Sequence, residues 1–278
     1  MNTKLKINLA KFCYQIIHWI RAIVNKNDQV VTKRQNIIWD LDLSEGIDFS
    51  IYILGAFEKA TVNRYTDIVK EGDIVFDIGA NCGSHTLPLA KLVGSKGKVF
   101  AFEPTDYAYK KLRRNIELNE ELKSRINPLQ VMIADHTMTH LVPEIYSSWP
   151  LKNKDALHPD HFGALKTTKG SSIETVDGFV KKHKLKKLDF IKLDVDGNEF
   201  SVLSGSQDTL ARFKPKILLE IAPSCHSKEQ FKGFLQILQN NKYEGLSIKT
   251  LKPLSLDYAT LTQNIKFGSS INVLLQIP

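Results

Sequence analysis

The segment Asp77-Ile-Gly-Ala-Asn-Cys-Gly83 combines an acid with two glycines where an apolar run ends and a helical pattern begins. Glycines at such a point allow the backbone to turn tightly and to approach a ligand. The free amides at the start of the following helix carry a partial positive charge, which favours an anionic or carboxylate-bearing ligand. The segment therefore predicts a ligand-binding turn.

A second acid, Glu103, ends the next apolar run about 20 residues after Gly83. An acid at this spacing can accept hydrogen bonds from both hydroxyls of a ribose, and it would not tolerate a phosphate on that ribose. Each motif alone has a simpler explanation, as an ordinary turn or a solvated strand end. Together and in this order, they predict a ligand that contains an unphosphorylated ribose.

NAD and S-adenosylmethionine both meet this description. A dinucleotide site requires GxGxxG, whereas this turn reads DxGxxxG and begins with Asp77. That acid would repel a pyrophosphate but attract the positively charged amino group and sulfonium of S-adenosylmethionine. We therefore expect S-adenosylmethionine as the cofactor, and the glycine spacing argues against a nicotinamide-dependent oxidoreductase.

The elements that must position these residues alternate regularly along the chain. Helical patterns lie between apolar runs, and two later stretches, 245–248 and 271–276, could close a sheet as a hairpin. This predicts an α/β, Rossmann-like fold with a mostly parallel seven-stranded sheet and helices on both faces. The expected strands before the hairpin are residues 73–78, 98–102, 129–133, 188–193 and 216–221, and the helices between them are 84–93, 106–119, 173–184 and 200–213.

Two regions lie outside this alternation. Residues 135–171 form a long segment with three prolines and four histidines, which we interpret as a substrate-facing insertion. Residues 1–54 form an N-terminal extension, with short strands expected in 36–53, and a helix is expected over 55–70. The predicted organisation is thus an extension over 1–54 and a Rossmann-like domain over 55–278.

Residues 1–24 predict an amphipathic helix, because apolar side chains recur there at helical spacing. Lys6, Lys11 and Arg21 leave the uncharged run too short to span a hydrocarbon layer of roughly 30 Å. Peripheral contact with a membrane, packing against the protein's own body and a homodimer all remain open for this helix. Its apolar residues are Leu5, Leu9, Phe12, Ile16, Ile17, Ile20, Ile23 and Val24.

Composition limits the class of protein further. A hydrophobic content of 42% and a charged content of 24% are ordinary for a soluble globular chain. The net charge of +8 favours anionic partners, but much of it is dispersed, and we find no nucleic-acid-binding signature. Three cysteines without metal-ligand spacing favour a reducing compartment, so we expect a cytoplasmic protein, with or without peripheral membrane contact.

Six segments between about residues 42 and 222 resemble the FkbM-type family of S-adenosylmethionine-dependent methyltransferases. They are LSEGIDFSIYILGAFE (43–58), GDIVFDIGANCGSHTL (72–87), FEP (102–104), IAD (133–135), ETVDGF (174–179) and LDFIKLDVDGNEFSVLSGS (188–206). The resemblance implies a class I methyltransferase fold and methyl transfer to an oxygen, commonly on a sugar, glycan or other secondary metabolite. It also implies site roles: the methionine end of the cofactor for Asp77, Gly79, Asn81 and Gly83, the ribose for Glu103, the adenine amino group for Asp135, and the methyl group for Asp194.

Asp194 and His161 are the candidate catalytic residues. Asp194 follows the fourth expected strand, at the edge where open α/β sheets bind ligands. Methyl transfer to a hydroxyl requires removal of its proton, which an Asp or His within hydrogen-bond reach would assist. The simpler alternatives are a turn residue for Asp194 and an exposed loop residue for His161.

The acids around Asp194 could also hold a hard cation through oxygen ligands. Loop solvation and the start of a helix explain them more simply, so we expect no metal. The group comprises Asp194, Asp196, Glu199 and Glu220.

The function expected from the sequence is O-methylation of a hydroxyl on a small-molecule or glycan acceptor. Two alternatives stay open: a non-catalytic protein that binds S-adenosylmethionine, and a methyltransferase that acts on nucleic acid. Against the second, the chain lacks the Pro-Pro-aromatic tetrapeptide and the Pro-Cys nucleophile that base methylation commonly uses.

Overall fold

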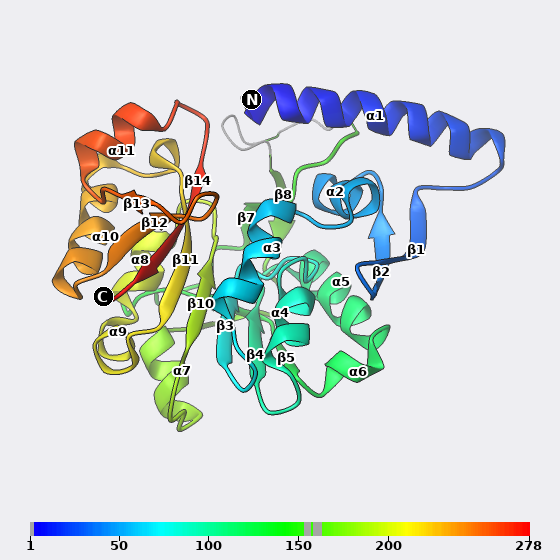
Figure 1. The fold of residues 1–278 in the computed structure, drawn as a ribbon. Helices are drawn as coiled ribbons and strands as arrows, with labels where there is room; N and C mark the ends of the chain where they lie inside the picture. The colour runs from blue at the N-terminus through cyan, green and yellow to red at the C-terminus, as the bar shows by residue number, and fades with distance from the viewer. Residues whose placement is uncertain (1–2, 153–156, 158–162) are drawn as a thin grey trace.

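The computed structural model describes residues 3–152, 157 and 163–278. Within these residues the main sheet has eight strands in the order β13-β12-β14-β11-β10-β3-β4-β5 (Figure 1). Five strands are parallel: β3 (Ile74–Ile78), β4 (Lys98–Phe102), β5 (Ile126–Leu129), β10 (Phe190–Leu193) and β11 (Lys216–Ile221). The antiparallel strands are β14 (Ile271–Gln276), β12 (Glu244–Ser247) and β13 (Pro253–Leu254).

The mostly parallel α/β sheet is confirmed, and the expected number of strands is low by one. The additional strand is β13, which has two residues and pairs with β12. So short a segment carries no alternation of apolar residues, and its strand conformation depends on β12 beside it.

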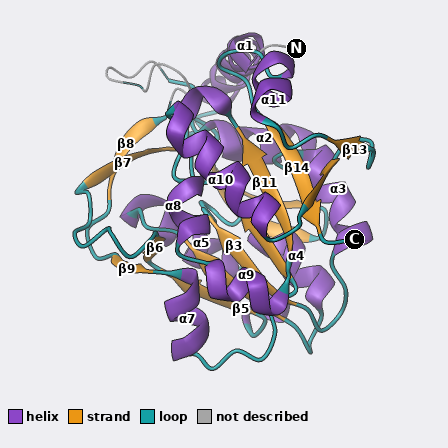
Figure 2. Cartoon of the chain, turned by 90° about the vertical axis from the view of Figure 1, so that its left-hand side faces the viewer, coloured by secondary structure: helices purple, strands orange, loops and turns teal. Residues whose placement is uncertain are grey.

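Both faces of the sheet are covered, which explains why its central strands are apolar throughout. Val75 belongs to one buried cluster and the next residue, Phe76, to another on the opposite face. The first cluster includes side chains of α3 (Lys59–Ile68), α4 (Thr86–Val93) and α5 (Asp106–Glu117). The second includes those of α7 (Val176–Lys182), α8 (Glu199–Ser204), α9 (Gln207–Phe213) and α10 (Lys228–Asn240), as Figure 2 shows.

The expected strand over 129–133 is wrong as a single element. β5 ends at Leu129, and β6 (Val131–Ile133) pairs instead with β9 (Ser172–Glu174) in a separate two-stranded sheet. β5 begins earlier than expected and contains Pro128, which cannot donate a ladder hydrogen bond. It is accommodated because β5 pairs only with β4, at the edge of the sheet.

One helix was not expected, and two expected helices have different bounds. Residues expected as strands form α2 (Gly46–Leu54), whose Asp48 accepts a hydrogen bond from the Asp42 amide. The helix expected over 173–184 begins only after Thr175, whose side chain accepts a hydrogen bond from the Gly178 amide. The helix expected over 200–213 is divided into α8 and α9 around Gly205, where a Cβ would lie 2.4 Å from the Ala134 carbonyl oxygen.

The extension consists of α1 (Thr3–Ile23), the hairpin β1 (Gln29–Arg34) and β2 (Ile37–Asp42), and α2. Its apolar residues, among them Trp39 and Leu41, share a buried cluster with Leu112 and Ile116 of α5. The extension therefore packs on the main domain, and the division at residue 54 stays a prediction. No helix in the described part of the chain is long and apolar enough to cross a membrane.

The remaining elements are short. The insertion contributes the hairpin β7 (Glu144–Ser147) and β8 (Ala164–Thr167), and a 3-10 turn covers Pro223–Cys225. Two further helices are α6 (Glu120–Lys123) and α11 (Tyr258–Asn264).

Candidate active site

The carboxyl ends of β3, β4 and β10 lie side by side, because these strands are neighbours and parallel. The Gly79 and Ala80 amides donate to the Phe102 carbonyl, and the Asp194 amide donates to that of Ile78. The structure therefore gathers Asp77, Glu103 and Asp194 at one edge of the sheet. This is the edge at which open α/β sheets bind ligands.

The glycines of the turn are required by close approaches within the protein. Gly79 has φ +84°, and a Cβ on it would lie 1.9 Å from the backbone oxygen of Asp194. Gly83 has φ +91°, and its Cβ would meet the Leu87 and Leu112 side chains at 2.6 and 2.9 Å. Both positions accept only glycine, with or without a ligand.

Glu103 is 3% exposed and receives three hydrogen bonds. Oε1 accepts from the Thr105 amide and hydroxyl at 2.9 and 2.5 Å, and Oε2 accepts from the Asn81 amide at 2.9 Å. Burial raises the pKa of Glu103 despite these bonds. A carboxylate offers about four acceptor positions, so Oε2 retains one, which fits a ribose hydroxyl.

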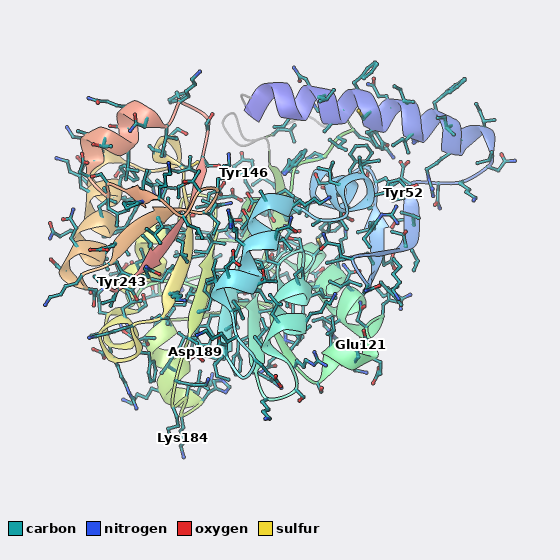
Figure 3. The ribbon with its side chains drawn as sticks, viewed as in Figure 1. Tyr52, Glu121, Tyr146, Lys184, Asp189 and Tyr243 are labelled. Atoms are coloured by element: carbon teal, nitrogen blue, oxygen red, sulfur yellow. The ribbon has the colours of Figure 1, made fainter. Side chains whose placement is uncertain are left out.

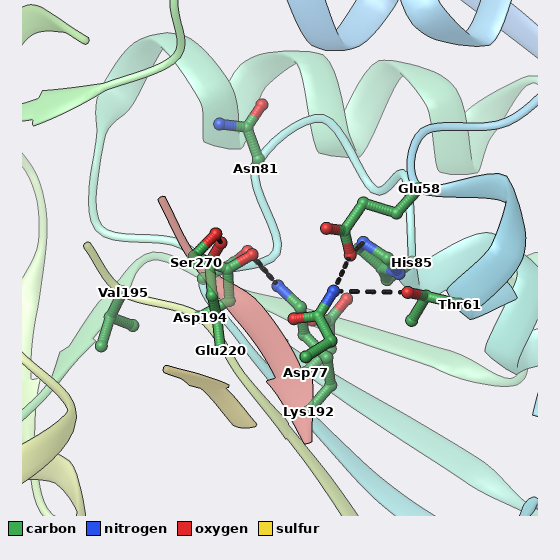
Figure 4. A network of polar contacts seen from close by, with 12 residues as sticks. Glu58, Thr61, Asp77, Asn81, His85, Lys192, Asp194, Val195, Glu220 and Ser270 are labelled. Atoms are coloured by element: carbon green, nitrogen blue, oxygen red, sulfur yellow. Dashed lines mark hydrogen bonds and ion pairs between the residues drawn. The ribbon is translucent and has the colours of Figure 1, made fainter. Parts of the chain in front are cut away.

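A buried cation, Lys192, lies between two acids in Figure 4. Its Nζ is 3.0 Å from Oδ2 of Asp194 and 4.0 Å from Oδ1 of Asp77. The register pairs Lys192 with Asp77 on adjacent strands, which places both side chains on the same face of the sheet. We did not identify Lys192 from the sequence, although a lysine inside an apolar strand is an unusual feature that could have marked it.

Asp77 is fully buried, and burial raises its pKa. Oδ2 accepts from the Thr86 hydroxyl at 2.6 Å, whereas Oδ1 has no hydrogen-bond partner among the residues that the structure describes. That oxygen is an acceptor that fits the ammonium end of S-adenosylmethionine, so Asp77 and Glu103 together fit this cofactor. Their roles in binding it stay predictions.

Asp194 is held as a carboxylate. Burial works against its ionisation, but the Lys192 ammonium and a hydrogen bond from Glu220 outweigh this and lower the pKa of Asp194 to about 2. Burial and the Asp194 charge raise the pKa of Glu220 well above its ordinary value. The Ser270 hydroxyl donates to Glu220 on the other side. The raised pKa favours the protonated form of Glu220, which can donate a hydrogen bond to the Asp194 carboxylate.

The acidic group predicted from the sequence is only partly assembled. Oxygens of Asp194, Asp196 and Glu220 lie within 4.8 Å of one another. Glu199 instead accepts from the Val195 and Gly197 amides, each at 3.1 Å, and lies 3.0 Å from His226. Its expected place at the start of a helix is confirmed by α8.

A second buried cluster, not predicted from the sequence, lies beside Asp77 (Figure 4). Tyr65 and His85 share a hydrogen bond of 2.7 Å, and Nε2 of His85 lies 3.8 Å from Glu58. Burial, assisted by the Lys192 charge, lowers the pKa of His85 to about 3. His85 is therefore neutral and does not compete with Lys192 for the carboxylates.

The insertion reaches the ligand-binding turn. Nδ2 of Asn81 donates to the Ser148 hydroxyl at 3.1 Å, and the Gly46 amide donates to the Trp149 carbonyl at 2.9 Å. Figure 3 shows Tyr146 of β7 on the α1 side of the molecule and Asp189, which precedes β10, near the other end of the sheet. The substrate-facing role of the insertion stays a prediction.

Of the two remaining predicted residues, the structure describes only Asp135. Asp135 follows β6 and accepts from the Thr137 amide and hydroxyl at 2.8 and 2.6 Å, while its own amide donates to Ser201. One oxygen of Asp135 is thus occupied by its own turn. His161 lies outside the described residues.

Comparisons with known proteins show which family this chain resembles. Residues 77–244 match the family described as "Methyltransferase FkbM domain". The chain is 26% identical to the hexuronic acid methyltransferase AglP of Haloferax volcanii over 160 residues, which are 55% of this chain and 58% of that protein. The match thus spans less than two thirds of that relative.

Two solved structures with similar folds are a complex with AdoMet and an FkbM methyltransferase. The M. jannaschii TYW2 complex with AdoMet has 18% identity and a TM-score of 0.46, covering 90% of this chain and 85% of that one. Methyltransferase FkbM from Methylobacillus flagellatus KT has 14% identity and a TM-score of 0.44, covering 87% of this chain and 63% of that one.

The matched family segment exceeds half of the 278 residues and contains Asp77, Glu103 and Asp194. S-adenosylmethionine is the cofactor of this family. The chain belongs to the FkbM methyltransferase family.

Proposed function

We propose that this protein transfers a methyl group from S-adenosylmethionine to a hydroxyl oxygen of a sugar. The observation that carries the proposal is the ionised Asp194 at the strand-end edge, beside the turn that fits the cofactor. The sugar acceptor is inferred from the relative AglP, whose name specifies a hexuronic acid.

The cofactor would be held by residues already in place. Oε2 of Glu103 would accept from a ribose hydroxyl, and Oδ1 of Asp77 would face the ammonium group. Asp135, which follows β6, would accept from the adenine amino group. When bound, S-adenosylmethionine supplies an electrophilic methyl carbon and a neutral thioether leaving group.

Asp194 would position the acceptor. A carboxylate with a pKa of about 2 is a weak base before reaction, so it would first accept a hydrogen bond from the acceptor hydroxyl. The proton would move toward Asp194 only as the oxygen attacks. Most of the rate enhancement would then come from aligning the oxygen with the methyl carbon.

The first test is methylation of a defined panel of acceptors, followed by mass spectrometry. The panel contains a hexuronic-acid oligosaccharide, a neutral oligosaccharide and total RNA, each incubated with the protein and S-adenosylmethionine. We expect a methyl group on the hexuronic-acid oligosaccharide. Methylation of RNA alone, or of no member of the panel despite cofactor binding, would overturn the proposed acceptor class.

The second test changes the positioning acid. Asp194→Asn should lower kcat about 10²-fold or more, while cofactor affinity changes little. Asp208→Asn removes an exposed carboxylate on α9 and should leave kcat unchanged. Equal activity of Asp194→Asn and the wild type would remove Asp194 from the mechanism.

A further inference from the structure

Helix α1 has two apolar faces, and only one packs against the protein. Ile7 and Tyr14 are buried, and Ala10 and Ile17 pack against the main core. The other face carries large apolar side chains that are exposed to solvent, including Phe12 at 61% and Trp19 at 66%. We call it the outer stripe; its members are Leu9, Phe12, Ile16, Trp19, Ile20 and Ile23.

The outer stripe is continuous and points away from the body. At about 100° of rotation per residue, its members fall within a sector of roughly 100°. The centre of that sector lies about 150° from the centre of the packed face. An ordinary surface helix would carry polar side chains there, so the stripe requires an apolar partner.

The charge around the stripe identifies the kind of partner. Residues 1–27 contain five cationic residues and no Asp or Glu. A second copy would bring the same cationic segment and the same net charge of +8 to the contact, which opposes a homodimer. An apolar stripe with an exposed tryptophan and flanking cations suits the surface of an anionic bilayer. The cations are Lys4, Lys6, Lys11, Arg21 and Lys26.

The helix is fixed to the body in a position ready for this contact. The Tyr14 hydroxyl donates to Asp28 at 2.8 Å, and His18 lies 2.8 Å from the same carboxylate. Arg21 donates to the backbone oxygens of Asn27 and Gln29. Docking would therefore not need to fold the helix first, which reduces its entropic cost.

We propose that the outer stripe docks this protein on the surface of an anionic lipid bilayer. Figure 1 shows α1 on the side of the molecule toward which the parallel strands point. A bilayer in contact with the stripe would lie on that side, which is also the side of the strand-end site. Membrane docking does not depend on the identity of the methyl acceptor, because the proposal rests on α1 alone.

The experiment is cosedimentation of the full-length protein with vesicles of phosphatidylcholine, with or without phosphatidylglycerol. We expect sedimentation with the mixed vesicles, weaker binding to phosphatidylcholine alone, and loss of the difference at high salt. The double variant Phe12→Glu/Trp19→Glu should lower partitioning at least about tenfold.

A matched control is Lys184→Glu, which also changes the net charge by −2 but lies at the end of the molecule opposite α1 in Figure 3. It should bind vesicles as the wild type does. Binding of S-adenosylmethionine by each variant establishes that its main domain is folded.

Two results would overturn the proposal. One is wild-type protein left in the supernatant with both kinds of vesicle. The other is a dimer, seen by size-exclusion chromatography with light scattering, that Phe12→Glu/Trp19→Glu dissociates; the partner of the stripe would then be a second copy. Neither result depends on methylation, so failure here is distinct from failure of the proposed function.

Discussion

At the scale of single residues, Lys192 is the main electrostatic link of the site. It is a buried ammonium beside two buried or partly buried carboxylates, and Asp77 and Asp194 raise its pKa against the effect of burial. Burying one charge among others is costly unless each is compensated. The three groups are therefore expected to depend on one another.

Lys192→Met should lower the free energy of unfolding by about 3–5 kcal/mol, because it leaves Asp77 and Asp194 without their cation. The measurement is urea unfolding at neutral pH. Lys187→Met is the control: it removes a half-exposed ion pair with Asp189 and should change stability by less than about 1 kcal/mol. Similar stability of the two variants would contradict a compensating role for Lys192.

Gly79 and Gly72 share a left-handed backbone and differ in their surroundings. A Cβ on Gly79 would lie 1.9 Å from the Asp194 backbone oxygen, whereas a Cβ on Gly72 has its nearest neighbour at 4.0 Å. Gly72→Ala should cost about 1–2 kcal/mol of backbone strain. Gly79→Ala should cost that strain and a backbone displacement, in total more than about 3 kcal/mol in urea unfolding. Equal costs would show that the backbone at Gly79 and the backbone at Asp194 can move apart without an energetic cost.

At the scale of elements, the buried carboxylate of Asp28 is one of the contacts that hold α1 on the body. Burial opposes ionisation of Asp28, but hydrogen bonds from His18, Lys152 and Tyr14 outweigh it and lower the pKa of Asp28 from 3.8 to about 2. A group whose pKa is lower in the folded state stabilises that state above its unfolded pKa. The stabilisation is lost as the pH falls through the folded value.

Asp28→Asn should therefore cost roughly 2 kcal/mol between pH 5 and 7, and this difference from the wild type should shrink as the pH falls from about 4 toward 2. The measurement is urea unfolding of both proteins across this pH range. Asp67→Asn, which breaks an exposed ion pair with Arg64, should show a small difference throughout. A pH-independent cost for Asp28→Asn would mean that the carboxylate acts through its shape and not its charge.

Elements buried on both faces were predictable from the sequence, and elements that depend on one neighbour were not. β4 and β11 have the expected bounds because both consist mainly of buried apolar residues. β5 was misplaced because Pro128 interrupts an edge strand, and α2 because its isoleucines also suit a strand. The local sequence pattern alone does not determine the type or the bounds of such elements.

The same distinction applies to the site. Asp77, Glu103 and Asp194 could be placed together because each lies at or directly after the carboxyl end of a parallel strand, and parallel strands end at one edge. The role of Lys192 depends on its register with Asp77, and that of Glu220 on its hydrogen bond with Asp194. Neither relation can be read from spacing along the chain.

At the scale of the whole molecule, the three tryptophans allow the extension to be followed separately from the cofactor site. Trp19 and Trp39 lie in the extension, and Trp149 lies in the insertion, in contact with Gly46. None lies on a strand of the main sheet. Tryptophan fluorescence therefore reports on the extension and the insertion, while circular dichroism reports on the whole chain.

Because the extension and the main domain share a buried cluster, we expect them to unfold in one transition. S-adenosylmethionine at about 100 times its Kd should stabilise the folded state by about 2.7 kcal/mol and raise Tm by roughly 5–10 °C. The unfolding midpoints measured by tryptophan fluorescence and by circular dichroism should rise together, although the tryptophans lie outside the strands that form the site. With Glu103→Gln the shift should shrink for both signals, and NAD should produce none. A fluorescence midpoint that stays in place while the circular dichroism midpoint rises would show that the extension unfolds independently, and the shared core would then contribute little cooperativity.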